Sequence, residues 1–247
     1  MFLTLGTLTA QNRSVHWISN AGFYIDLPNG DILIDAILSS DDEIARAEGR
    51  FADVRLIFVS HVHGDHFNAK GLLSHLMANS KAQAILTPES FNALKQAGLT
   101  KEMESRVTVS FPAPEKLEAF TLGEFSGHIL QFRHAGVQNI GLGLKGKDIT
   151  LAYLNGGSTN VERANQFSSI YQQSDIVIAN KWPLAGQAYI ARVASRLSPS
   201  LLLMAHHSGA QDGIVQKGGG VKSMEKFMSK DGMKGRVFTK RMEVERF

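Results

Sequence analysis

The sequence predicts an α/β fold: a four-layer αββα sandwich of two mixed β-sheets flanked by helices. Segments typical of strands fall into two blocks along the chain, and segments typical of helices occur in both blocks. Each block can supply one sheet, which buries one face against the other sheet and its second face against helices. The chain has 247 residues, of which 43% are hydrophobic, and this is enough apolar surface for such a core.

The first block opens with three short strands and continues as strands that alternate with helices. Residues 28–31, Pro-Asn-Gly-Asp, are a turn signal, because proline fixes φ and Asn-Gly suits a tight turn. Residues 53–60, DVRLIFVS, are typical of a strand that is buried on both faces. The expected elements are strands at 15–19, 22–27, 31–36, 53–60 and 82–87 and helices at 41–48, 69–80 and 88–98.

The second block ends in a strand–helix–strand unit. The expected elements are strands at 106–111, 128–134, 140–146, 148–154, 174–180 and 199–207, a helix at 188–197, and near the end a helix at 221–229 and a strand at 235–240. No repeat or linker divides residues 13–247, so we expect one domain. Its last part, 213–247, is a basic segment with nine Lys and Arg against four acids. We expect a solvated tail after the glycine run 218–220, because the arginine and aromatic interleaving of a nucleic-acid platform is missing.

Composition excludes several classes of function. The absence of cysteine removes disulfides, cysteine nucleophiles and thiolate metal ligands. No run of about 18 apolar residues occurs, so we expect no membrane span. Residues 1–12 are apolar and free of acids, and they fit either the end of a secretory signal, with Ala10 near the cleavage site, or an opening strand. The first interpretation slightly favours a periplasmic or secreted location.

One loop carries four potential metal ligands within six positions. His61, His63, Asp65 and His66 directly follow the apolar run, in the sequence SHVHGDHF. Residues two apart on a tight loop can turn toward one point, so His61 and His63 can share one ion while Asp65 and His66 face a second point. Neutral imidazoles and a carboxylate are ligands that zinc accepts where cysteine is absent. The pattern therefore predicts a metal site.

The sequence HVHGDH after an apolar strand resembles the H-x-H-x-D-H signature of the metallo-β-lactamase superfamily, whose fold is an αββα sandwich. Residues 19–36 look like the opening strands of that fold, and FRHAG (132–136) and LLLMAHH (201–207) place later histidines in the expected order. Within the superfamily the chain most resembles poorly characterised metal-dependent hydrolases, many of them exported. They are related to lactonase-like members that act on ascorbate 6-phosphate.

The resemblance implies a role for each of these residues. A first ion would be held by His61, His63 and His134, and a second one by Asp65, His66 and a late histidine, with His206 favoured over His207. Asp35 would orient a ligand, and Asp65 would also orient the nucleophile and pass a proton to the leaving group. The implied cofactor is one or two zinc ions, with manganese or iron as alternatives. The implied partner is a small-molecule substrate.

The chain departs from the family where members with two metals carry a bridging aspartate at the end of a later strand. That place reads LNGGS (154–158), so Gly156 or Gly157 stands where the carboxylate is expected. Asn155 is the nearest polar candidate, and its amide oxygen is an uncharged, weaker ligand. A bridging carboxylate offsets the charge of two ions about 3.5–4 Å apart, so we expect weaker binding of the second ion. The nearest acids in sequence that could substitute are Asp148, Glu162 and Asp212.

Three functions follow from these patterns. The first is a hydrolase in which metal-bound hydroxide attacks an ester, lactone, amide or phosphoester. The second keeps the fold and binds metal or ligand without turnover, because the bridge is missing. The third, ranked last, is a nucleic-acid phosphodiesterase, suggested by the basic segment. Lys181, in the loop 179–189, is a candidate contact for an anionic group of the substrate, although the loop fits simple packing equally well. The sequence carries no signal for an oligomeric state.

Overall fold

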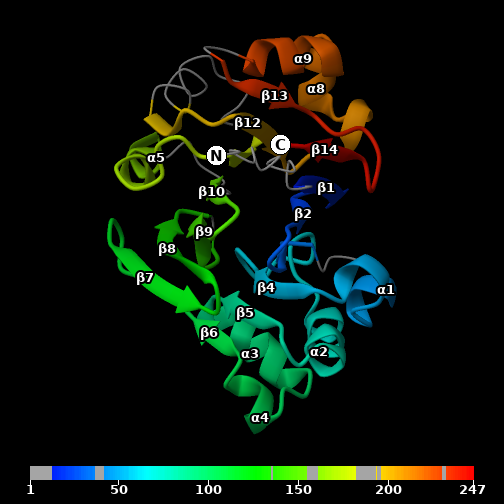
Figure 1. Cartoon of the computed structure of the whole chain (residues 1–247), viewed down its shortest axis with the longest axis vertical. Coiled ribbons are helices and arrows are strands. Elements are labelled where there is room, and N and C mark those ends of the chain that lie inside the picture. Colours follow the sequence, from blue (N-terminus) through cyan, green and yellow to red (C-terminus); the bar gives the residue numbers. More distant parts are fainter. Residues whose placement is uncertain are drawn as a thin grey trace, which may run out of the picture.

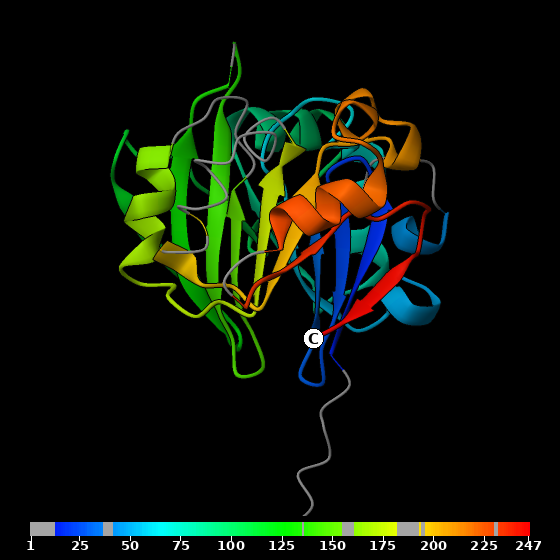
Figure 2. The same cartoon turned by 90° about the horizontal axis from the view of Figure 1, so that it is seen from above.

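The computed structural model describes residues 13–36, 42–134, 136–154, 161–181, 193, 196–229 and 232–247. In this part of the chain the strands form two seven-stranded sheets that face each other, with helices on their outer sides (Figures 1 and 2). The strand order is β14-β1-β2-β3-β4-β5-β6 in the first sheet and β13-β12-β11-β10-β9-β8-β7 in the second. Both sheets are mixed, so the predicted αββα sandwich is confirmed.

Five strands of the first sheet are those expected in the first block, whereas the strand at 107–109 was expected in the second block and the strand at 244–246 was not expected. Its strands are β1 Ser14–Ser19, β2 Gly22–Asp26, β3 Asp31–Ile34, β4 Val54–Phe58, β5 Gln83–Leu86, β6 Val107–Val109 and β14 Val244–Arg246. The helices between them are α1 Asp42–Ala45, η1 Gly49–Phe51, α2 Ala69–Ala78, α3 Pro88–Gln96 and α4 Lys101–Glu104. Local chemistry fixes the starts of the longer helices: Asn68 caps α2 by accepting from the Gly71 amide, and Thr87 caps α3 with Pro88 in its first turn.

The second sheet and its helices include elements that the sequence pattern did not indicate. Its strands are β7 Leu117–Leu122, β8 Phe125–Phe132, β9 Asn139–Lys145, β10 Thr150–Leu154, β11 Ile176–Asn180, β12 Leu201–Ala205 and β13 Lys234–Arg236, and its helical segments are α5 Val161–Ser168, η2 Gly209–Gln211, α8 Gly213–Lys217 and α9 Val221–Met228. We did not expect β7, α5, η2 or α8. The expected helix at 188–197 falls mostly outside the described residues.

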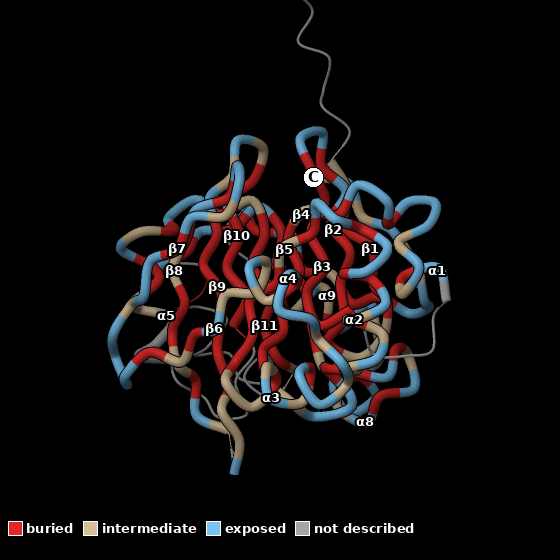
Figure 3. Tube along the Cα trace, turned by 90° about the horizontal axis from the view of Figure 1, so that it is seen from below, coloured by how far each residue is buried: buried red, intermediate tan, exposed pale blue. Residues whose placement is uncertain are grey.

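Three buried clusters among the described residues separate the four layers. The central cluster joins the sheets and includes Phe58 of β4, whose ring meets that of Tyr153 of β10 edge to face at 5.8 Å. A second cluster packs the first sheet on α2, and a third packs the second sheet on α5 and α9. Figure 3 shows the buried stretches running along the strands of both sheets, with exposed loops at their ends. Each large apolar side chain buried in this way stabilises the fold by about 1.5–3 kcal/mol.

The basic segment 213–247 is not the solvated tail that we expected. Its strand β13 pairs with β12 at the edge of the second sheet, and β14 pairs with β1 at the edge of the first. Arg236 lies 2.6 Å from Glu225 and also contacts Glu243, so acids within the segment offset part of its positive charge. The helix α9 buries Met224 and Met228. Counting the charges of the segment could not show this packing, because the packing comes from strand pairing with both sheets.

The strand directions bring several chain segments to one edge of the sandwich. In the first sheet β3 and β4 run parallel, and in the second sheet β8, β10, β11 and β12 share one direction, because β9 is antiparallel to both β8 and β10. The residues that follow these strands therefore lie at their common carboxyl edge. No helix in the part of the chain that the structure describes is both long enough and apolar enough to cross a bilayer.

Candidate metal centre

The histidine loop is a tight turn between β4 and α2. The backbone amides of His66 and Phe67 both donate to the carbonyl of His63, each at 2.9 Å. The start of β9, directly after the loop that carries His134, is tied to it, because the Ile140 amide donates to the carbonyl of Ser60 at 3.0 Å. Hydrogen bonds at both points hold the two loops in a fixed relation.

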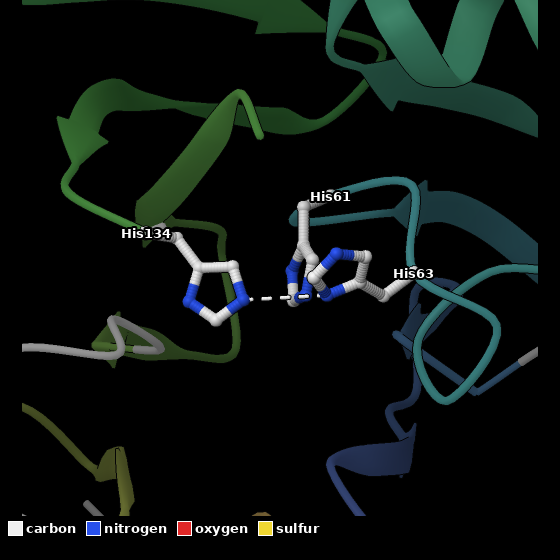
Figure 4. Close-up of side chains that lie close together, drawn as sticks. All are labelled: His61, His63 and His134. Carbon is white, nitrogen blue, oxygen red and sulfur yellow. Dashed lines mark hydrogen bonds between the residues drawn. The ribbon is translucent and has the colours of Figure 1, made fainter. Parts of the chain in front are cut away.

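Three histidine side chains converge at this edge (Figure 4). The donor atoms of His61, His63 and His134 all lie within 4.8 Å of one another, and His63 Nδ1 is 3.3 Å from His134 Nε2. Two nitrogens bound tetrahedrally at about 2.0–2.1 Å from zinc would be separated by ~3.3 Å. The Nε2 atom of His61 is buried and finds no hydrogen-bond partner among the described residues. This geometry fits a metal ion, and it is the arrangement that the sequence predicted for the first ion.

A second group lies beside the first. The donor atoms of His61, Asp65 and His66 lie within 4.8 Å of one another. Asp65 Oδ2 is 3.5 Å from His66 Nε2 and 3.2 Å from His206 Nε2, so His206 adjoins this group through Asp65. The structure thus brings the six predicted ligands together at one edge.

Electrostatics put these side chains in the forms that bind metal. Burial lowers the pKa of His61 to about 3, and the neighbouring His66 adds to the effect. Burial likewise lowers the pKa of His134 and of His206. Burial would raise the pKa of Asp65, but its electrostatic interaction with the neighbouring His66 and His206 holds it below its ordinary value. Neutral imidazoles and an ionised carboxylate are the forms that ligate metals.

Asp35 bonds the Nδ1 atom of His66, whose Nε2 atom faces Asp65. The fully buried carboxylate of Asp35 accepts from the Ser60 amide at 2.7 Å, from Ser60 Oγ and Tyr153 Oη at 2.6 Å, and from His66 Nδ1 at 2.8 Å. Burial alone would raise the pKa of Asp35, but His66 and these hydrogen bonds hold it below its ordinary value. An ionised Asp35 keeps the proton of His66 on Nδ1, which leaves the lone pair of Nε2 facing Asp65. A contact of this kind is what the orienting role that the resemblance implies for Asp35 would require.

Backbone strain concentrates at the same place. Asn20, Asp35 and His206 have φ angles of 44°, 44° and 61°, a region that residues other than glycine seldom adopt. A Cβ at Gly22 would lie 2.8 Å from the carbonyl oxygen of Asp35 and 3.0 Å from the Cα of Ala36. The β1–β2 turn therefore packs its backbone directly against Asp35, and only glycine allows this approach.

The other predicted site residues have other partners or are not described. Lys181 is ion-paired with Asp212 at 2.7 Å, and Asp212 also caps α8. The ring of His207 stacks on Trp17 at 4.8 Å, and its Nδ1 accepts from the Gly209 amide. Asn155, Gly156 and Gly157 lie outside the described residues, as does the side chain of Glu162, and Asp148 contacts Arg13 and Asn29 near the β2–β3 turn.

Sequence reasoning missed three residues that support the site: Asn20, Ser60 and Tyr153. Ser60 was visible as the polar residue between the buried strand and His61. Tyr153 reads as one more apolar residue of β10, and its bond to Asp35 spans 118 positions of the chain. No local pattern reports a contact of that kind.

The fold and these ligands define a metallo-β-lactamase-fold protein with a candidate metal centre. No protein-family model matches the chain. It is similar to two UPF0173 metal-dependent hydrolases: one of Pyrococcus horikoshii, 26% identical over 56% of this chain and 64% of the relative, and one of Pyrococcus abyssi, 23% identical over 78% of this chain and 84% of the relative. These relatives are consistent with the metallo-β-lactamase superfamily.

Solved structures with the same fold come from proteins of different chemistry. The metallo-β-lactamase fold protein YhfI of Bacillus subtilis has a TM-score of 0.64 at 16% identity, over 96% of this chain and all of that one. The short form of human tRNase Z has a TM-score of 0.58 at 13% identity, over 81% and 94%. The diiron β-hydroxylase CmlA of Streptomyces venezuelae has a TM-score of 0.61 at 12% identity, over 97% and 55%. These likenesses show the fold alone.

Proposed function

We propose that this chain is a metal-dependent hydrolase that acts on an ester, lactone, amide or phosphoester of a small molecule, with zinc as its metal. The observation that carries the proposal is the convergence of His61, His63 and His134, with the buried Nε2 of His61 left without a partner among the described residues. The names of the two archaeal relatives, metal-dependent hydrolases, support it.

Each half of the centre would have a distinct task. His61, His63 and His134 would hold a first ion, and Asp65, His66 and His206 a second one. Zinc, when bound, lowers the pKa of water to about 7 and polarises the bond to be cleaved. Manganese or iron would suit the same imidazole and carboxylate donors.

Asp65 is placed to handle protons. Its side chain is 49% exposed, whereas that of His66 beside it is fully buried. Among the three side chains proposed for the second ion, Asp65 is therefore the most exposed to a substrate. An ionised carboxylate in this place can orient the attacking water, take up its proton and return it to the leaving group.

A non-catalytic protein that binds metal is the second candidate, and one sequence feature favours it. Gly156 or Gly157 stands where the resemblance to the metallo-β-lactamase superfamily places a bridging aspartate in members with two metals. Of the acids that could replace it, Asp212 forms an ion pair with Lys181, and Asp148 accepts a hydrogen bond from Asn29. Loss of the bridge weakens the second ion, while three histidines and one open position are sufficient for hydrolysis with a single zinc.

Metal content and turnover together test the proposal. Zinc-reconstituted protein should hold one or two ions by mass spectrometry and should hydrolyse a compound of an ester, lactone, amide or phosphodiester panel. His63→Ala removes a ligand and should reduce zinc affinity by on the order of 100-fold or more. His128→Ala is the control: His128 lies in β8 and bonds the hydroxyl of Tyr171, so its loss should leave zinc binding intact. A wild-type protein that takes up no metal refutes the proposal, and stoichiometric zinc without turnover supports the second candidate.

A further inference from the structure

Asn20 connects the two sheets at the second half of the metal centre. It lies in the β1–β2 turn, and its side-chain amide donates to Asp65 twice, to the carboxylate oxygen Oδ2 at 2.9 Å and to the backbone carbonyl at 3.2 Å. Its own backbone carbonyl accepts from the His206 amide at 3.0 Å and from Trp17 Nε1 at 3.1 Å. Asn20 thus contacts two of the three residues that would hold the second ion: the side chain of Asp65 and the backbone amide of His206.

The contacts of Asn20 orient Asp65 and His206. Asp65 Oδ2, the atom that takes the Asn20 amide proton, is also the atom that faces His66 and His206. Asp65 is half exposed, so without this bond its carboxylate could turn toward solvent. His206 has a φ of 61°, and its amide bond to Asn20 helps to hold this conformation.

The conformation of Asn20 explains the residue type. Its φ is 44°, and asparagine is among the few residues that accept this region without large strain. A glycine or aspartate would also fit the backbone, but neither can donate to a carboxylate through its side chain. The position therefore combines a turn conformation with a side-chain donor, which only asparagine supplies well.

We propose that Asn20 is a positioning residue for the second metal ion: it aims Asp65 and His206 at a common point, in place of the rigidity that a bridging carboxylate would supply. This inference rests on the proposed function. It assigns to Asn20 an effect on the second ion alone, because no contact of Asn20 involves His61, His63 or His134 among the described residues.

Stepwise titration of the metal-free full-length protein with Co²⁺ tests the assignment, with calorimetry for the two binding steps and visible absorption for the environment of each ion. The variant is Asn20→Gly, which suits the positive φ, keeps both bonds to the Asn20 carbonyl and removes only the donors to Asp65. The matched control is Gln173→Gly, which removes an exposed amide side chain at a φ of 58° before β11, at the opposite edge of the sheet. Comparing the two variants cancels the effect of placing glycine at such a position.

The expected result is a second binding step weakened about 10- to 100-fold in Asn20→Gly, with the first step and its absorption bands unchanged and with Gln173→Gly like wild type. Equal losses in both steps, or a second step like that of wild type, would overturn the inference. Wild-type protein that binds a single ion would overturn it as well, while leaving the proposed hydrolase intact. A wild-type protein that binds no ion refutes the proposed function itself.

Discussion

Replacing Asp35 by asparagine tests how the centre is organised, because the change alters one atom in a fully buried network. An amide presents one oxygen and one NH₂ group where the carboxylate presents two acceptors. If the NH₂ group faces the Ser60 amide, two donors meet and the backbone cannot adapt. If it faces His66, the hydroxyls of Ser60 and Tyr153 can rotate to accept, and His66 can accept only by moving its proton to Nε2. We therefore expect the second orientation and a changed tautomer of His66.

The structure sets the size of two effects. Hydrogen bonds to a charged acceptor contribute about 1.5–3 kcal/mol and neutral ones about 0.5–1.5 kcal/mol, so each bond to Oδ2 should lose about 1–1.5 kcal/mol. Weakening all three should lower the free energy of unfolding of the metal-free protein by about 3–4.5 kcal/mol. A protonated Nε2 has no lone pair for a metal. Affinity for the second ion should fall about 10- to 100-fold, or about 1.4–2.7 kcal/mol.

Two measurements separate these effects. Urea unfolding of metal-free Asp35→Asn and wild type gives the stability difference, and NMR of the imidazole nitrogens reports which nitrogen of His66 carries the proton. Tyr153→Phe is the control: it removes one bond to Oδ2 and leaves an ionised Asp35 facing His66, so it should lose about 1.5–3 kcal/mol of stability with the tautomer unchanged. If Asp35→Asn kept the proton on Nδ1 and bound both ions as wild type does, the reasoning about Asp35 would be wrong.

Three further predictions concern the surroundings of the site. Gly22→Ala should cost about 1–3 kcal/mol in thermal unfolding, because its Cβ meets the backbone of Asp35; an unchanged melting temperature would contradict the close approach. Burial raises the pKa of Asp31 to about 6, so ionised Asp31 should lower the free energy of unfolding by ~3 kcal/mol above pH 6. The free energy of unfolding should therefore decline as the pH rises from 4 to 6. Asp31→Asn should flatten this decline, because its amide can donate to Tyr24 Oη and accept from the Leu27 amide; an equally steep decline would refute it. Zinc at 100 times its Kd should raise the free energy of unfolding of wild type by about 2.7 kcal/mol, and a chelator should reverse this gain. His63→Ala should show no such gain at the same zinc concentration.

The fold was predictable because its signals are local. Alternation, apolar runs and turn residues indicate most strands and helices, and DVRLIFVS leads directly into the histidine loop. β7 escaped detection because half of its residues are exposed and it lies at a sheet edge. The segment 213–247 misled charge counting, because its pairing with β12 and β1 depends on contacts far apart in sequence.

In the candidate site, too, the contacts within one loop were predictable and the contacts between the two sheets were not. His61, His63, Asp65 and His66 share one loop, so their spacing alone predicts that they meet. That His206 reaches Asp65, and that Tyr153 reaches Asp35, follows from how two sheets pack, which no spacing encodes. The assignment of metals to these groups remains a prediction.

Both halves of the centre take side chains from both sheets, and this ties ligand geometry to the packing of the sandwich. In the first group His61 and His63 follow β4 and His134 follows β8; in the second, Asp65 comes from the first sheet and His206 from the second. Residues that join the sheets without ligating metal, such as Tyr153, therefore set how far apart the ligands stand. A sheet displacement of 1 Å would exceed the tolerance of a Zn–N bond of about 2.0–2.1 Å. The buried network at Asp35 includes the bond from Tyr153, which joins the two sheets. Disrupting this network should therefore alter metal affinity even in a variant that still folds.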